Sequence, residues 1–246
     1  ARRHLANMCR GLEEHLAMVF HRFLAGEVRA KRLAMYINEN KVVPWDPFAR
    51  MEDNTQKLDQ VVLRVDAAKG KSDVVLEPYV LPHQSEFSTL DAFNRASGPN
   101  RWNRQQGFYI YRSDRLIQSG GWSNLRTLDE HHKLARVALS FSPRLDEEFK
   151  INVPKMRVAL PASIREQVSK AIGPVVSMAN HAYRSSEKKG RGATHPIVVG
   201  NTSSKSGGEK GASSGSTGVS TSGPICNSIT SDNIDFNSLM LLLERV

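Results

Sequence analysis

The sequence predicts an α+β fold, with a small mixed or antiparallel sheet flanked by helices and followed by a disordered Ser/Gly-rich tail. Three observations predict it. Strand-like stretches with polar turns fill the middle of the chain, helical patterns lie on both sides of them, and the composition then shifts to serine and glycine. Strands grouped together, rather than alternating strictly with helices, are typical of α+β domains.

The N-terminal segment, residues 1–31, is predicted to be a connecting helix. Apolar residues from Leu5 to Phe23 recur at spacings of three and four, which gives one apolar stripe, and Gly26 suits the end of the helix. The segment also holds His4, His15 and His21. No carboxylate or cysteine cluster accompanies these histidines, so we do not expect a metal site here.

Residues 32–183 are predicted to form the α+β domain itself. Period-two patterns and turn residues indicate its strands, and a 3.6-residue period indicates its last helix, which Pro174 interrupts. In chain order we expect a hairpin over 32–44, strands over 58–65 and 73–81 joined by a turn at 67–72, a short helix or loop over 87–93, a hairpin over 107–117, strands over 134–141 and 151–158, and a helix over 162–183.

Residues 184–232 are predicted to be a flexible basic linker, and residues 233–246 a short amphipathic helix. Asn201 to Pro224 contains eight serines and six glycines and has almost nothing to bury. Residues 184–224 include six basic and two acidic residues, so this segment supplies +4 of the net charge of +9. A basic surface gathers phosphates, so nucleic acid bound through the surface and the tail is one expected partner.

Other features favour a cytoplasmic protein without a recognisable catalytic motif. The two cysteines, Cys9 and Cys226, form neither a disulfide framework nor a metal-ligand spacing, and no apolar run approaches a membrane span. Gly70-Lys71-Ser72 lacks the earlier glycine of a phosphate-binding loop, so a solvated turn is expected there. The pair His131-His132 is expected at the surface, and the acidic run Asp146-Glu147-Glu148 at the start of a turn or helix.

Several separate motifs nevertheless occur in an order that resembles the transducer region of bacterial GHKL-type ATPases, the Hsp90-like and MORC-like group. The resemblance extends over roughly residues 4–170. Its motifs are Gln106 to Ile117 with Gly120-Gly121-Trp122, then Leu134-Ala135-Arg136-Val137, then Asp146 to Lys155, and finally Leu160-Pro161 and Ile164-Arg165. His15 to Leu24 and Tyr36 to Phe48 are similar to the region that joins the ATPase domain to its transducer.

The resemblance implies a small α+β domain beside an ATP site, to which it contributes a lysine that contacts the γ-phosphate. The matching residue is Lys155; an exposed surface lysine is the alternative. Phe149 and Pro154 depart from the pattern, which has Trp and a second lysine there. The motifs of the nucleotide pocket are absent, so ATP and Mg²⁺ are expected only in a complete protein, with this chain inactive alone.

The expected partners are therefore an N-terminal GHKL nucleotide-binding domain, a second copy in a homodimer, and nucleic acid. The predicted function is to sense the γ-phosphate and to relay the nucleotide-dependent change to a partner or to DNA. Two alternatives remain open: a non-catalytic basic module that binds nucleic acid, and a degenerate interaction scaffold.

Overall fold

The computed structural model describes residues 2–28, 33–67, 70–151 and 158–191, all of them within one compact unit, Ala1–Ala193. Helices α1 (Arg2–Val19) and α2 (His21–Leu24) come first, and the small hairpin β1 (Tyr36–Ile37) and β2 (Asn40–Lys41) follows. The predicted helix and hairpin are both present. The strands of the hairpin are shorter than expected, and its turn residues, Asn38 and Glu39, take the positive φ values, 48° and 68°, that a two-residue turn requires.

The main sheet is mixed, as predicted. It has six strands in the order β3-β5-β8-β6-β7, and β4 also pairs with β5. Strands β6 and β8 are parallel, and the remaining pairs are antiparallel. The strands are β3 (Gln56–Lys57), β4 (Val61–Ala67), β5 (Gly70–Val80), β6 (Gly107–Arg112), β7 (Arg115–Ser119) and β8 (Ala135–Phe141).

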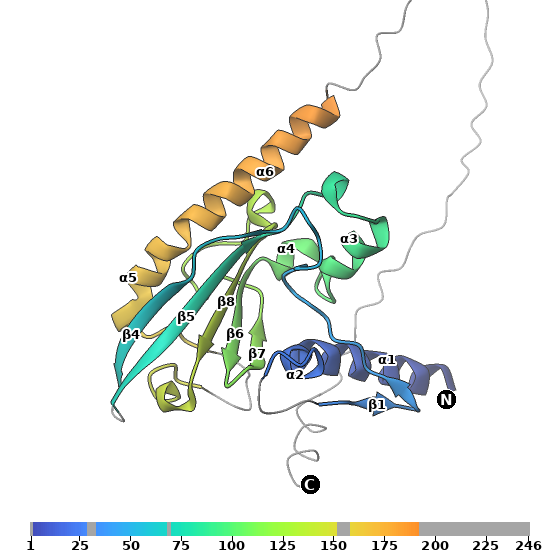
Figure 1. The fold of residues 1–246 in the computed structure, drawn as a ribbon, viewed down its shortest axis with the longest axis horizontal. Coiled ribbons are helices and arrows are strands. Elements are labelled where there is room, and N and C mark those ends of the chain that lie inside the picture. The colour runs from blue at the N-terminus through green and yellow to red at the C-terminus, as the bar shows by residue number, and fades with distance from the viewer. Residues whose placement is uncertain (1, 29–32, 68–69, 152–157, 192–246) are drawn as a thin grey trace, which may run out of the picture. The chain divides into compact units, whose positions relative to one another are not determined.

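Helices α5 (Ala162–Ala171) and α6 (Gly173–Arg191) run along the sheet and pack on β4, β5 and β8 (Figure 1). Their apolar stripe is buried, at Ile164, Val168, Ile172, Val175, Val176 and Ala179. The break between the helices comes just before Pro174, as predicted, because proline disrupts a helix interior. Helix α6 continues past the expected end at Tyr183 to Arg191. Of the described helices, none combines the length and apolarity required to traverse a bilayer.

The central strands β6 and β8 are covered on both faces, which explains their continuous burial. Tyr109 and Arg136 lie on one face, against Trp45 and the segment around it. Phe108 lies on the other face, where it meets Trp122. Alternate side chains of β8 therefore point to opposite faces of the sheet, as the period-two pattern predicts, but both faces are buried.

Two sequence expectations are corrected by the strand pairing and by helix boundaries. The turn expected at 67–72 is shorter, since β4 and β5 stay paired up to Ala67 and Gly70, and Lys71 and Ser72 belong to β5. After α3 (Leu90–Ser97) and the Gly98-Pro99-Asn100 break comes an unexpected helix, α4 (Arg101–Gln105), which is too short to show a period. Most of the strand expected over 151–158 falls outside the described residues.

Arg136 links the sheet to two surface segments from a fully buried position. Its Nη1 donates to the carbonyl oxygen of Pro47 at 2.5 Å, and its Nη2 donates to that of Ala96 at 2.7 Å. The guanidinium also lies over the rings of Trp102, at 5.2 Å, and Tyr109, at 5.7 Å. Burial lowers the pKa of Arg136. The two carbonyls and the ring faces compensate for its lost hydration.

We expect Arg136→Met to reduce the free energy of unfolding by about 3 kcal/mol, because two buried carbonyls lose their donors. Urea unfolding followed by circular dichroism measures the change. Arg64→Met is the matched control, since Arg64 pairs with Asp73 at the exposed surface and should cost well under about 1 kcal/mol. Equal stabilities for the two variants would show that Arg136 does not anchor these segments.

Candidate functional site

Lys155, the residue predicted to contact the γ-phosphate, lies outside the described residues. The chain before it is firmly held. Phe149 is fully buried and stacks on Phe141 of β8, with ring centroids 4.0 Å apart and planes 3° apart. Phe149 is one of the departures from the transducer pattern, and it fills the core position in this fold. Val158, where the description resumes, is also buried.

The strongest motif, from Gln106 to Ile117, forms the predicted hairpin, and its distinctive residues serve packing. A Cβ on Gly107 would lie 2.2 Å from the carbonyl oxygen of Gly121, and φ at Gly107 is 106°, so only glycine fits there. The indole of Trp122 donates to the side-chain oxygen of Gln106 at 3.1 Å. These contacts join the beginning of β6 to the turn after β7.

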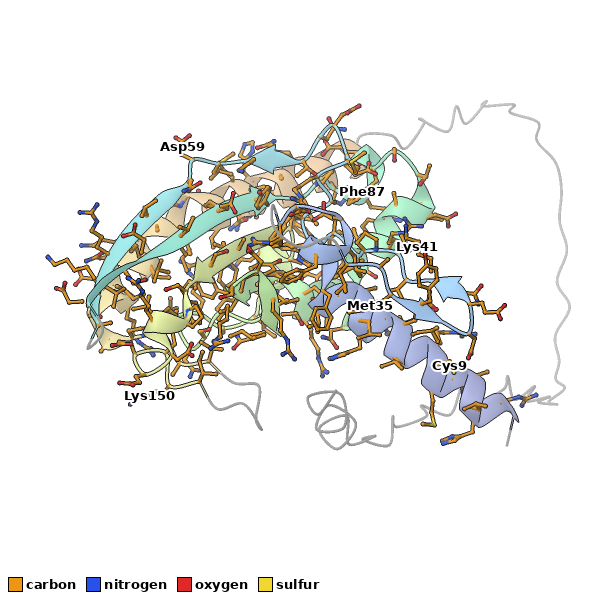
Figure 2. All side chains as sticks on the ribbon, turned by 60° about the horizontal axis from the view of Figure 1, so that its bottom comes forward. Cys9, Met35, Lys41, Asp59, Phe87 and Lys150 are labelled. Atoms are coloured by element: carbon orange, nitrogen blue, oxygen red, sulfur yellow. The ribbon has the colours of Figure 1, made fainter. Side chains whose placement is uncertain are left out.

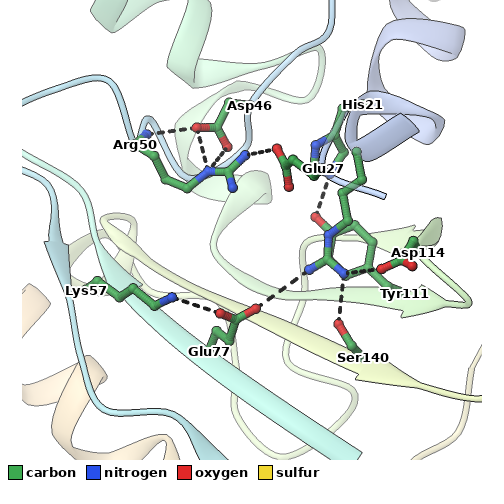
Figure 3. Close-up of polar contacts among 10 residues, drawn as sticks. His21, Glu27, Asp46, Arg50, Lys57, Glu77, Tyr111, Asp114 and Ser140 are labelled. Carbon is green, nitrogen blue, oxygen red and sulfur yellow. Dashed lines mark hydrogen bonds and ion pairs between the residues drawn. The ribbon is translucent and has the colours of Figure 1, made fainter. Parts of the chain in front are cut away.

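The polar side chains that converge in this fold lie elsewhere, where α2 and the 46–57 segment meet the sheet. Figure 3 shows this charged network, which consists of His21, Arg22, Glu27, Asp46, Arg50, Lys57, Glu77, Tyr111, Asp114 and Ser140. Its members lie on α2, β3, β5, β6 and β8, just after α2, in the 46–50 segment and in the β6–β7 turn. The network surrounds a pocket of about 460 Å³, which also has Phe48, Thr55 and Tyr79 in its wall.

Arg22 of α2 is the member with the most partners. Its Nη1 lies 3.1 Å from both Oδ1 of Asp114 and Oγ of Ser140, and its Nη2 lies 3.9 Å from Oε2 of Glu77. The guanidinium carbon is 3.6 Å from the centre of the Tyr111 ring. Arg22 is only 12% exposed. One side chain of α2 therefore contacts β5, β6, β8 and the β6–β7 turn.

Two further groups of charges extend the network. Lys57 donates to Oε1 of Glu77 at 2.9 Å, and this hydrogen bond raises the pKa of Lys57. Glu77 is thus shared between Lys57 and Arg22. Arg50 lies between two carboxylates, with Nε 3.0 Å from Asp46 and Nη2 2.5 Å from Glu27. Because Glu27 follows α2 directly, this pair is a second link between the helix and the rest of the domain.

His21 precedes Arg22 in α2, and it is only 1% exposed. Its Nε2 is 2.8 Å from the hydroxyl oxygen of Tyr111. Burial, and then the nearby charge of Arg22, lower the pKa of His21 to about 3. Burial also raises the pKa of Tyr111. Both groups are therefore neutral near pH 7 and form a hydrogen-bonded pair between helix and sheet.

The charges of this arrangement are largely compensated. Arg22, Arg50 and Lys57 are each paired with a carboxylate, so the pocket presents no concentrated charge of either sign. One hydroxyl lies beside an imidazole, in the buried pair of Tyr111 and His21. Across the described part of the chain, no group of three or more histidine, cysteine, aspartate or glutamate side chains is arranged to hold a metal ion.

The other residues considered from the sequence take structural positions. Asp146 of the acidic run forms a two-pronged ion pair with Arg112, at 2.6 and 2.7 Å. His131, half-buried, contacts Asp129 at 2.8 Å. Cys9 accepts a weak hydrogen bond from Asn38 of the β1–β2 hairpin at 3.5 Å, and Figure 2 shows it on the outer part of α1.

Sequence reasoning missed the charged network because its members are scattered between residues 21 and 140. One signal was available: Glu77 and Tyr79 share a face of β5, and a carboxylate within the otherwise apolar stretch from Val74 to Val80 indicates a partner. The identity of that partner, Arg22, depends on how α2 packs.

The chain was also compared with known proteins. No family model, no curated protein sequence and no solved structure matched it.

We expect His21 to make the fold less stable in acid. Between pH 6.5 and pH 3 the unfolded chain gains a proton on this histidine and the folded chain does not, so stability falls as pH falls through that window. From pH 7 to pH 5 the loss from His21 should be about 2 kcal/mol. Urea unfolding at both pH values measures it.

His21→Gln should remove that part of the pH dependence, while His181→Gln, which changes an exposed histidine of α6, should leave it intact. A His21→Gln variant that loses as much stability as the unaltered protein between pH 7 and pH 5 would contradict the assignment.

Proposed function

We propose that this chain is the transducer portion of a GHKL-type ATPase, in which it senses the γ-phosphate of ATP bound by a separate nucleotide-binding domain. It relays the nucleotide-dependent change to a partner or to DNA, and it has no catalytic competence alone. ATP and Mg²⁺ belong to the complete protein. Cytoplasmic localisation is part of the same proposal.

The single observation that carries this proposal is the ordered set of transducer-like motifs in the sequence. The fold is compatible with it. The motif-bearing strands are neighbours, since β6 pairs with β7 on one side and, in parallel, with β8 on the other. The mixed α+β sheet with flanking helices is the kind of domain that the resemblance implies.

The contacts of α2 supply a physical route for the relay. Residues 15–24 are similar to the segment that joins an ATPase domain to its transducer, and Arg22 lies within it. A displacement of α2 would act on β5 through Glu77 and on the β6–β7 turn through Asp114. A domain attached through α1 and α2 could therefore move the sheet without contacting it.

The proposal is tested first on Lys155, in protein expressed from the whole gene with its upstream coding sequence. We expect Lys155→Ala to slow ATP hydrolysis by at least about tenfold while changing the affinity for adenosine much less, because a lysine on the γ-phosphate acts mainly on the transferred group. The chain of 246 residues alone should show no turnover.

Steady-state hydrolysis and adenosine titration measure these two quantities. Lys150→Ala serves as the matched control, since Lys150 is an exposed lysine on the same segment. The proposal fails if the upstream sequence encodes no Glu-x-x-x-Asn and Asp-x-Gly-x-Gly motifs, or if Lys155→Ala hydrolyses ATP at the unaltered rate.

The relay is tested on Arg22. In the same whole protein we expect Arg22→Lys to leave ATP binding intact but to reduce the ATP-dependent change in hydrogen exchange of β5 and β6. Lysine keeps the charge but cannot contact Asp114, Ser140 and Glu77 together. Arg64→Lys, at the exposed pair with Asp73, should preserve the change. An undiminished ATP response in Arg22→Lys would exclude Arg22 from the relay.

A further inference from the structure

The turn between α3 and α4 exposes three arginines within ten residues of sequence. We call residues 94–104 the α3–α4 corner; its arginines are Arg95, Arg101 and Arg104. No ion pair or side-chain hydrogen bond engages these guanidinium groups within the described part of the chain. Asp91 lies one helical turn before Arg95 and forms no ion pair with it. These cations differ from those of the charged network, where Arg22, for example, is paired.

Backbone hydrogen bonds bring the three arginines together. The amide of Gly98 donates to the carbonyl of Arg95 at 3.1 Å, and the amide of Arg101 donates to that of Gly98 at 3.3 Å. Arg104 follows three residues later on α4, a spacing that places it beside Arg101 on the helix surface. The corner therefore carries three exposed positive charges on one short, hydrogen-bonded turn and the helix that follows it.

Buried side chains hold the backbone of the corner through hydrogen bonds to its carbonyl oxygens. Arg136 donates to the carbonyl of Ala96, Trp45 donates to that of Arg95 at 2.8 Å, and Tyr109 donates to that of Gln105 at 2.9 Å. A Cβ on Gly98 would lie 2.7 Å from the Trp45 ring, so the turn fits closely on its support. Charges held on a rigid backbone lose less conformational entropy when they bind a partner.

Half-buried aromatic rings lie beside these charges. Trp102, between Arg101 and Arg104, stacks on Phe93 with centroids 4.7 Å apart and planes 23° apart. Phe87, labelled in Figure 2, meets both rings edge-on. The ring of Trp102 therefore packs against Phe93 and the Arg136 guanidinium, and it supports the turn that carries the arginines. Exposed guanidinium groups suit phosphate oxygens.

We propose that the α3–α4 corner is a nucleic-acid-binding surface, on which Arg95, Arg101 and Arg104 contact the phosphodiester backbone. This inference does not depend on the proposed transducer function, since it concerns binding in the absence of nucleotide. The proposal places the nucleic-acid contact on the folded domain. The sequence alone predicts such a contact only for an unspecified surface and the tail.

The test is binding of fluorescein-labelled single-stranded and duplex DNA, and of RNA of the same sequence, by the full chain, measured by anisotropy across a salt series. The triple variant Arg95→Gln, Arg101→Gln, Arg104→Gln should lose at least about tenfold in affinity at low salt. With duplex DNA its salt slope should fall by about 2 to 3, since each lost phosphate contact removes about 0.9.

A matched triple variant distinguishes the effect of the corner arginines from the effect of the net charge of the chain. Arg64→Gln, Lys71→Gln and Arg165→Gln remove the same charge from exposed positions elsewhere, and all tail charges stay in both variants. We expect this control to bind with an affinity within about threefold of the unaltered chain. Equal losses in the two variants, or no binding of any nucleic acid by the unaltered chain, would overturn the proposal.

Tryptophan fluorescence tests the place of the contact, because Trp102 lies between Arg101 and Arg104. Trp45 and Trp122 are buried, so a change in fluorescence on binding of nucleic acid reports on Trp102, and Trp102→Phe should abolish it. A polyglutamate peptide that competes as well as DNA, with the same loss in the corner variant, would show that the partner is an acidic protein and overturn the nucleic-acid assignment.

Discussion

The buried guanidinium of Arg136 holds the two outer regions of this domain in place. It sits on β8, one of the two central strands, and its two terminal nitrogens bind backbone carbonyls that lie 49 residues apart in sequence, at Pro47 and Ala96. Pro47 belongs to the segment that carries Asp46 and Arg50 of the charged network. Ala96 belongs to the α3–α4 corner. A single charge in the sheet thus fixes both surfaces on which the functional proposals depend.

A buried cation is costly unless its hydrogen-bonding capacity is used, and this explains the composition around Arg136. Hydrophobic residues of equal volume could fill the space, but they could not bind the carbonyls of an irregular segment and a helix end. Three aromatic rings, from Trp45, Trp102 and Tyr109, face the guanidinium and provide polarisable walls. Its Nε has no hydrogen-bond partner among the described residues. The charge therefore stays committed to the backbone.

The sequence could predict the features that depend on residues close together in the chain, and not those that depend on tertiary packing. The β6–β7 hairpin was predictable because β-formers on both sides of a polar turn are a local signal, and the break at Pro174 was predictable for the same reason. Helix α4 was not, since five residues show no period. The charged network was not either, because the pairing of Arg22 with Asp114 depends on tertiary packing. The α+β class was correct, and the role of Lys155 stays a prediction.

The charged network and the α3–α4 corner also differ in how easily they can rearrange. In the network, Arg22 lies 3.1 Å from Asp114 but 3.9 Å from Glu77, and Glu77 is already bonded to Lys57. Arg22 therefore has two carboxylates between which a shift of α2 could redistribute its contacts. At the corner, the carbonyls of Arg95, Ala96 and Gln105 are bound by the side chains of Trp45, Arg136 and Tyr109, all of them buried.

Under the two proposals, the network would carry the relay and the corner would bind nucleic acid. A relay needs an element with more than one arrangement, and Arg22 has two carboxylates as partners. At the corner, buried donors hold the backbone that carries the exposed arginines. Because both are anchored through Arg136, displacement of the 46–50 segment would pull on the same side chain that supports the corner. Movement at α2 and binding at α3–α4 therefore share a physical connection through β8.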